Sequence, residues 1–372
     1  MRITMNRILF AILRRLAIAA VFALPGLAPA ADQAVHVYNW SDYITRPALA
    51  AFQQETGIKV IYDVYDGNEI LEAKLFAGRS GYDVVFPTAE PNGARHIAAK
   101  LYRPLDKSRL PNLKHLDPAM LKSLEKADPG NAHLVPYLWG STGIGINVDK
   151  VRQALGRDPE ASWALLFDPA NAAKLAACGI SLLDADDEAF GAALIHLGKD
   201  PNSAKSDDLE AAAALLRRLR PQVKYFHASK YIADLANGEL CVAHGYSGDV
   251  LQARSRAREA KRNVRIAYLL PREGALVAVD AMAIPADAPH PGAAHAFIDF
   301  LLRPEVIAGI TNEVAFPNAN ASATALLKAE IRDDPAIYPP PELRARLVGP
   351  QSLPPEAQKM RARTWTRIKS GR

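Results

Sequence analysis

The stretch Val37-Tyr38-Asn39-Trp40-Ser41-Asp42-Tyr43 decides the fold of this chain. Val35 and Val37 alternate with polar residues as in a half-buried strand, and Thr45 marks the start of a predicted helix that ends at Gly57. Residues 58–64 predict a second strand. The order strand, loop, helix, strand is typical of an open α/β sheet, in which ligands lie beyond the carboxyl ends of the strands. We therefore expect this loop to contact a ligand.

The side chains of the loop favour a cationic ligand. Asp42 places a carboxylate between Trp40 and Tyr43. An ammonium group can pair with such an acid while each ring face attracts it by about 0.5–2 kcal/mol. The alternative is that both rings belong to the core and that Asp42 only caps the helix, a common role of aspartate. The loop by itself leaves both interpretations open.

Residues 1–30 have the pattern of a cleavable secretory signal. Four arginines precede the apolar run 16–27, and Ala28-Pro29-Ala30 supplies the small residues of a cleavage site. The run is short for a membrane span, and an uncleaved anchor is the weaker alternative. No cysteine follows the cleavage site, so a lipid anchor is not indicated. We expect an exported protein.

Composition limits the classes of partner. Residues 1–30 hold four arginines and no acid, so their removal lowers the formal charge from +5 to +1. This balance gives no reason to expect nucleic acid. The remaining length predicts two domains. Cys178 and Cys241 would face an oxidising compartment, where they form either one disulfide or two separate buried thiols.

Further strand ends repeat the opening pattern. Residues 82–86 predict a strand that ends near Thr88 and Glu90, at the same edge of the sheet as Asp42. Residues 135–147 are extended and rich in glycine, which suits a strand that crosses between two lobes. Their glycines match no phosphate-binding motif. We expect residues 264–271 to carry the chain back to the first lobe.

Acids also follow the strands of the second half. Glu188 and Asp249 come shortly after predicted strands, and Asp280 lies inside the apolar run 275–284. A lone carboxylate in such a run is costly to bury without a cationic partner. The sequence therefore predicts two α/β lobes, formed by residues 31–137 with 264–312 and by residues 138–263 with 313–372, around a cleft of acids and rings. Such a cleft fits a slender polycation.

Several long segments together resemble the periplasmic polyamine-binding proteins of ABC importers, most nearly the putrescine-binding branch. The similar segments span nearly the whole chain after residue 30; they are 38–44, 58–68, 137–150, 231–238, Gly248-Asp249-Val250 and Arg363-Thr364-Trp365. The resemblance implies a type II periplasmic-binding-protein fold, with a hinge between the lobes and a polyamine in the cleft. It also implies a monomer that delivers the polyamine to a membrane permease and needs no cofactor.

The resemblance assigns roles residue by residue. It implies that Asp42 and Asp280 hold one amine and that Glu188 and Asp249 lie near the other. The family's disulfide matches Cys178 and Cys241. The residues that match the family's ligand-binding positions are Trp40, Ser41, Asp42, Tyr43, Thr88, Glu188, Ser229, Tyr246, Asp249, Asp280 and Phe316.

The departures from the family concern specificity. Ala278 replaces an aromatic residue, and Tyr246 and Phe316 stand where tryptophan and tyrosine are usual. Glu90, before Pro91, adds an acid that could anchor another cation. Because Ala278 has no ring, we expect the site to be wider than in the family. These changes suggest putrescine, or a longer ligand such as spermidine, or agmatine with its guanidinium.

Other functions find less support in the sequence. No H-E-x-x-H or G-x-S-x-G motif is present, although paired acids could serve a hydrolase. The nine histidines are scattered, and the candidate cleft loops hold none in a ligand spacing, so no metal site is expected. A polyamine sensor of the same fold, or a binding protein for another cationic or amino-acid-like ligand, stays an alternative. The basic tail 355–372 reads as a solvated helix face.

Overall fold

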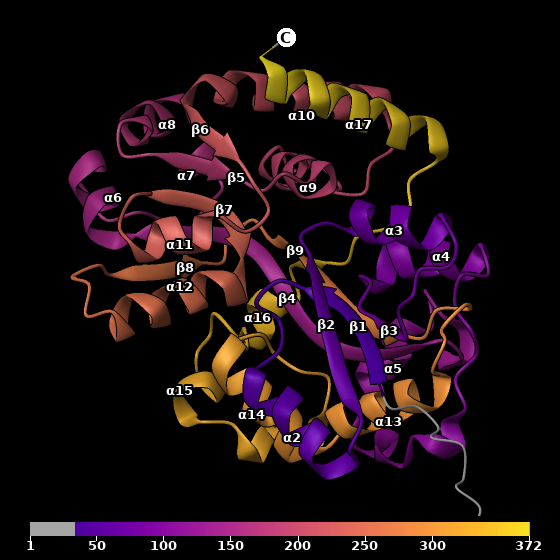
Figure 1. The fold of residues 1–372 in the computed structure, drawn as a ribbon. Helices are drawn as coiled ribbons and strands as arrows, with labels where there is room; N and C mark the ends of the chain where they lie inside the picture. Colours follow the sequence, from indigo (N-terminus) through magenta and orange to yellow (C-terminus); the bar gives the residue numbers. More distant parts are fainter. Residues whose placement is uncertain (1–33, 372) are drawn as a thin grey trace, which may run out of the picture.

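Strand β4 (Leu134–Asn147) runs through both lobes of the molecule (Figure 1). The computed structural model describes residues 34–371. The predicted signal segment 1–30 lies outside these residues and stays a prediction. Between residues 34 and 371, the model contains no helix with the length and apolar character that a membrane crossing requires.

Ten strands form one continuous sheet in the order β2-β1-β3-β9-β4-β7-β5-β6, with β8 paired to β4 and β10 paired to β9. The first half of β4 pairs antiparallel with β9, and its second half pairs antiparallel with β7 and β8. The other strands are β1 (Ala34–Trp40), β2 (Lys59–Tyr65), β3 (Val84–Val85), β5 (Ile180–Leu182), β6 (Val223–Phe226), β7 (Val242–Tyr246), β8 (Ile266–Leu269), β9 (Ala275–Ala283) and β10 (Leu347–Val348).

Helices cover the sheet in both lobes (Figure 1). They are α2 (Arg46–Thr56), α3 (Asn68–Phe76), α4 (Ala94–Ala98), α5 (Pro118–Leu124), α6 (Val148–Leu155), α7 (Ala164–Phe167), α8 (Pro169–Ala176), α9 (Asp186–His196), α10 (Ser206–Leu219), α11 (Tyr231–Ala236), α12 (Ser247–Glu259), α13 (Pro291–Leu301), α14 (Pro304–Val314), α15 (Ala329–Arg332), α16 (Pro341–Arg344) and α17 (Pro355–Ser370).

The opening of the chain folds as its sequence predicts. The Thr45 side chain caps α2 by accepting a hydrogen bond from the backbone of Ala48, and Gly57 ends the helix with φ 71°. Strands β1 and β2 are parallel. Parallel pairing directs the loop after β1 and the loop after β2 to the same edge of the sheet.

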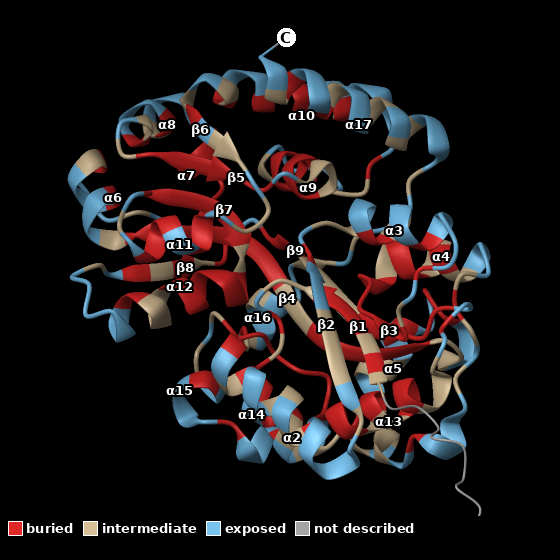
Figure 2. Cartoon of the chain, viewed as in Figure 1, coloured by how far each residue is buried: buried red, intermediate tan, exposed pale blue. Residues whose placement is uncertain are grey.

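The core of the first lobe lies on both faces of its sheet (Figure 2). Alternation along β1 directs Val35 and Val37 into one hydrophobic cluster, which they share with Phe52 of α2 and Phe297 of α13. Tyr38 points to the opposite face and packs in a second cluster with Leu71 of α3. Because both faces are buried, β1 is held in one register and its terminal loop is held in place.

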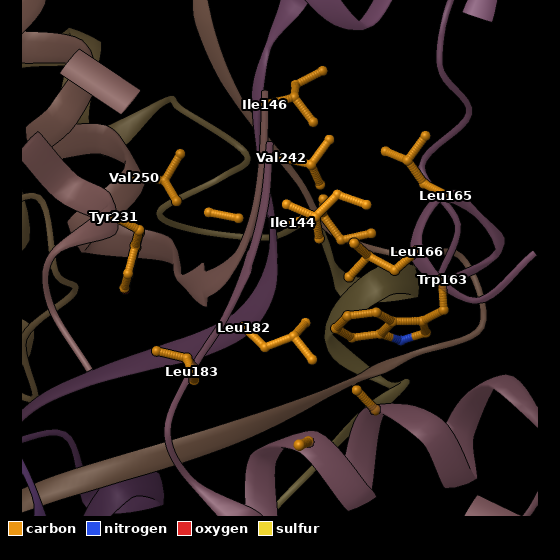
Figure 3. Close-up of a cluster of buried hydrophobic side chains, with 14 of the residues drawn as sticks. Ile144, Ile146, Trp163, Leu165, Leu166, Leu182, Leu183, Tyr231, Val242 and Val250 are labelled. Carbon is orange, nitrogen blue, oxygen red and sulfur yellow. The ribbon is translucent and has the colours of Figure 1, made fainter. Parts of the chain in front are cut away.

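The core of the second lobe surrounds the second half of β4. Figure 3 shows Ile144 and Ile146 of β4 packed with Val242 of β7 and with Trp163. The predicted disulfide is confirmed: Cys178, after α8, is bonded to Cys241, immediately before β7.

Two segments lie, in whole or in part, in a different lobe from the one that the sequence predicted. Residues 264–271 do not return to the first lobe, because Ile266 and Tyr268 of β8 are buried in the core of the second lobe. Strand β9 makes the return instead. Residues 313–372 divide: Phe316 and Leu327 pack in the first lobe, whereas Trp365 of α17 packs in the second.

Candidate functional site: an acidic cleft between the lobes

A cleft of about 890 Å³ lies between the two lobes. The wall on the side of the first lobe comes from the loop after β1, the start of α3 and the segment after β3. The wall on the side of the second lobe comes from the first turns of α9 and α12 and from one face of α17. The carboxyl ends of several strands therefore open into one space, as the strand order of the sequence predicts.

Asp280 lies on the first-lobe side of the cleft and is held by two hydroxyl groups. Tyr43 Oη donates to Asp280 Oδ2 over 2.8 Å, and Thr88 Oγ1 donates to Asp280 Oδ1 over 2.8 Å. Asn68 Nδ2 donates to Thr88 Oγ1 over 3.1 Å, which orients that hydroxyl group. Burial nevertheless raises the pKa of Asp280 to about 6, because neither neighbour carries a positive charge.

Asp249 occupies the first turn of α12 on the opposite side. Its carboxylate accepts a hydrogen bond of 2.6 Å from Tyr231 Oη, and that hydroxyl oxygen accepts one of 3.1 Å from the backbone N–H of Tyr246. Burial raises the pKa of Asp249 to about 7, against the opposing effect of the Tyr231 hydrogen bond. The acid is therefore positioned firmly while its charge remains poorly compensated.

Glu188 is the third buried acid of the cleft. It lies in the first turn of α9, and its buried Oε2 atom has no hydrogen-bond partner in the structure. Burial raises the pKa of Glu188 to about 8, and the charge of Asp187 contributes to this rise. A buried polar atom without a partner costs free energy, so this oxygen is available to an incoming donor.

The cationic side chains that line the cleft are already paired with other acids. Arg95 bonds with Glu72 through both carboxylate oxygens. Arg361 bonds with Asp186 over 2.9 Å, and Lys369 bonds with Asp184. Between residues 34 and 371, none of the lysines and arginines that line the cleft forms an ion pair with Asp280, Asp249 or Glu188. The cleft therefore offers three buried acids to a cation from solution.

Aromatic rings form the remaining walls. Trp40 packs on Tyr65 with ring centres 4.6 Å apart, and Phe316 meets Tyr43 edge to face at 4.8 Å. A Cβ atom at Gly248 would lie 2.2 Å from the Phe316 ring, so the glycine is needed for this packing. Rings on both sides of a narrow space can contact methylene groups between two charged ends.

The cleft brings together all but one of the residues that the sequence singled out. Ser229, in the loop after β6, and Ala278, opposite Gly140 in the register of β9 with β4, both face it. The predicted residues that line the cleft are Trp40, Ser41, Tyr43, Thr88, Glu90, Glu188, Ser229, Tyr246, Asp249, Ala278, Asp280 and Phe316.

Asp42 is the exception: the resemblance implies that Asp42 and Asp280 hold one amine, but Asp42 does not line the cleft in the structure. Asp42 has φ 56°, a left-handed backbone conformation that is uncommon for a residue other than glycine. Its carboxylate pairs with Arg256 of α12 over 2.8 Å and is 43% exposed. Gln252 also donates to the Asp42 carbonyl oxygen over 3.3 Å. Asp42 thus connects the two lobes beside the cleft.

Helix α17 contributes residues that the sequence did not reveal. The sequence favoured a solvated face for this segment, but the Trp365 side chain is buried and donates to Asp184 over 3.1 Å. Arg361 and Lys369 face the cleft from the same helix. Asp66, Glu69 and Asp187 line it as well. In the sequence, only the basic residues around Trp365 drew attention to this helix, and they did not indicate which acids they pair with.

The chain matches, over residues 48–339, the family described as bacterial extracellular solute-binding protein. It belongs to that family. This solute-binding protein is 49% identical over 349 residues to the putrescine-binding periplasmic protein PotF of Escherichia coli, covering 93% of this chain and 94% of the relative. It is 52% identical over 359 residues to the putrescine-binding periplasmic protein SpuD of Pseudomonas aeruginosa, covering 96% and 98%.

Solved structures agree with the two-lobed fold of this solute-binding protein. The spermidine/putrescine ABC transporter substrate-binding protein PotD of Streptococcus pneumoniae aligns with a TM-score of 0.75 at 27% identity, covering 91% of this chain and 99% of that one. The predicted fold class and the predicted resemblance to the putrescine-binding branch are confirmed.

Proposed function

We propose that this protein captures a small linear polyamine, putrescine foremost, in the periplasm and delivers it to the permease of an ABC importer. The observation that carries the proposal is the set of three buried acids, Asp280, Asp249 and Glu188, which face one cleft without a cationic partner among the described residues. The putrescine-binding relatives support it.

Each end of the ligand has a counterpart in the cleft. Asp280 accepts one ammonium group, and Asp249 and Glu188 accept the other. The methylene chain then lies against the rings of Trp40, Tyr246 and Phe316. A buried ammonium group is stable only when it is paired, so a monoamine leaves acids uncompensated and binds poorly.

Closure of the lobes completes the site. Strands β4 and β9 both run between the lobes, and their register shifts between Pro136 and Trp139. Bending at this irregularity brings the acids of α9 and α12 toward Asp280 and expels water. Hinge closure around a ligand is a common transition of two-lobed binding proteins. The protein acts as a monomer and binds its ligand without transforming it.

Two residues of the cleft, Ala278 and Glu90, allow it to bind ligands other than putrescine. Ala278 lines the cleft where a larger side chain would fill it. Glu90 also lines it, and burial raises the pKa of this acid. An additional acid suits the third ammonium group of spermidine or the larger guanidinium end of agmatine, so both are further ligands of the same cleft.

Titration calorimetry on the chain without residues 1–30 tests the proposal. The protein is stripped of copurified ligand by unfolding and refolding under non-reducing conditions, which preserve the Cys178–Cys241 bond. Putrescine, cadaverine, spermidine and agmatine are compared with butylamine, which supplies only one ammonium group. Tight 1:1 binding of a diamine with weak butylamine binding supports the proposal. A folded protein that binds none of these amines contradicts it.

A further inference from the structure

His36, Asp83 and His290 form a second cluster of polar groups, which lies outside the cleft. His36 is in β1, Asp83 comes just before β3, and His290 comes just before α13. None of the three lines the cleft. His36 precedes Trp40 by four residues, which corresponds to about 13 Å along a strand at roughly 3.3 Å per residue.

The two histidine rings have a suitable separation for one shared ion. Their centres are 5.8 Å apart, and their planes differ by 12°. Two imidazole groups on one zinc ion, with Zn–N distances of about 2.0–2.1 Å, hold their ring centres roughly 5–6 Å apart. Both residues are half-buried, so solvent reaches the rings.

Asp83 holds both histidines in place. The side chain of Asp83 is fully buried, and it accepts backbone hydrogen bonds from His36 over 2.8 Å and from His290 over 2.6 Å. His290 Nδ1 lies 3.1 Å from Asp83 Oδ2. One ligand atom from each of the three residues lies within 4.8 Å of the others. A carboxylate that anchors two backbones in this way preorganises the cluster.

We propose that His36, Asp83 and His290 form a binding site for a divalent transition-metal ion of the zinc class. The two imidazole nitrogens and one Asp83 oxygen are three ligands, and water completes the tetrahedron. Ligand atoms around zinc lie roughly 3.4 Å apart, so the two half-buried rings must rotate from their nearly parallel arrangement to bring the three groups onto one ion. Imidazole and carboxylate are ligands that zinc accepts readily.

The site is independent of the amine cleft, so its test does not depend on the proposed function. Zinc chloride is titrated into the tag-free chain without residues 1–30 by calorimetry, in the absence of amines. The expected result is one zinc ion per molecule. His36→Ala and His290→Ala should each weaken binding at least tenfold, whereas His115→Ala, at a half-buried histidine bonded to Ser322, should leave it unchanged.

A second readout uses the unsubstituted protein, in case a variant fails to fold. Cobalt in place of zinc should give the visible absorption of a tetrahedral site and should be displaced by one equivalent of zinc. Putrescine affinity should be the same in His36→Ala and in the unsubstituted protein. Zinc binding that survives both histidine substitutions, or the absence of a saturable 1:1 site together with no tetrahedral cobalt spectrum, would overturn the proposal.

Discussion

Tyr43 donates a hydrogen bond to Asp280 over 2.8 Å although 237 residues separate them in the sequence. Tyr43 follows β1 and Asp280 lies within β9, so the bond fixes the first-strand loop against the strand that returns between the lobes. The phenol hydrogen also stabilises the carboxylate form of Asp280, which is the form that an ammonium group needs.

Tyr43→Phe should weaken amine binding. The substitution removes one of the two hydroxyl donors of Asp280, and its pKa should rise further. A hydrogen bond to a charged group contributes about 1.5–3 kcal/mol, so we expect a loss of affinity of roughly tenfold or more. Calorimetry with putrescine at pH 7 measures it. Tyr82→Phe, at a tyrosine bonded to Asp63 outside the cleft, is the control and should bind normally.

Asp249→Asn and Asp280→Asn should each reduce putrescine affinity by about a hundredfold or more, because a buried ammonium group loses its partner at a cost of about 3–5 kcal/mol. Asp42→Asn should cause a much smaller loss, since Asp42 pairs with Arg256 outside the cleft. Binding constants of the three variants give the ranking. If Asp42→Asn weakened putrescine binding as much as Asp280→Asn, Asp42 would have to be counted among the residues that bind the ligand.

Glu188→Gln should stabilise the ligand-free protein at high pH. The pKa of Glu188 is about 8 in the folded state, above its ordinary value of 4.5. The folded state therefore holds a proton that the unfolded state has lost, and stability falls as pH rises from about 4.5 to 8. Denaturant unfolding should show a gain on the order of a few kcal/mol at pH 9 and little change at pH 4.

The control for this stability prediction is Glu305→Gln, at an exposed glutamate in α14. This variant should show no pH-dependent gain. Comparing each variant between the two pH values cancels the cost of burying the glutamine amide itself. An equal change at pH 4 and pH 9 would mean that the Glu188 charge is not the source of the effect.

Amine affinity should fall as pH is lowered from 8 to 6. Glu188 and Asp249, with pKa values of about 8 and about 7, must be ionised to pair with ammonium, and each becomes protonated in this window. We expect at least a tenfold loss of affinity and proton release on binding at pH 7. Calorimetry in two buffers of different ionisation enthalpy counts the protons. Binding that is independent of pH would contradict these carboxyl roles.

Glu90→Gln should reduce affinity for spermidine and agmatine more than affinity for putrescine. The acid lies in the cleft wall, where it can pair with the third ammonium group of spermidine or with the guanidinium group of agmatine, neither of which putrescine has. The affinity ratio of spermidine to putrescine in the variant and in the unsubstituted protein is the informative measurement. Unchanged affinities for all of these ligands would remove Glu90 from the site.

Local sequence patterns were sufficient to predict the structure where a residue contacts its neighbours in the sequence. The cap at Thr45, the turn at Gly57 and the alternation of Val35 and Val37 predicted the opening of the first lobe. The lone carboxylate of Asp280 in an apolar strand predicted a buried acid that needs a cation, because desolvation of a charge is costly wherever it occurs.

The sequence by itself determined two α/β lobes and most of the acids and rings of the cleft, and its resemblance to a known family implied the disulfide. Only the tertiary structure decided that Asp42 pairs with Arg256 of α12 and that α17 lies over Asp184 and Asp186. It also decided that β8 stays in the second lobe. These features depend on contacts between distant segments, and the free energy of such contacts cannot be read from neighbouring residues.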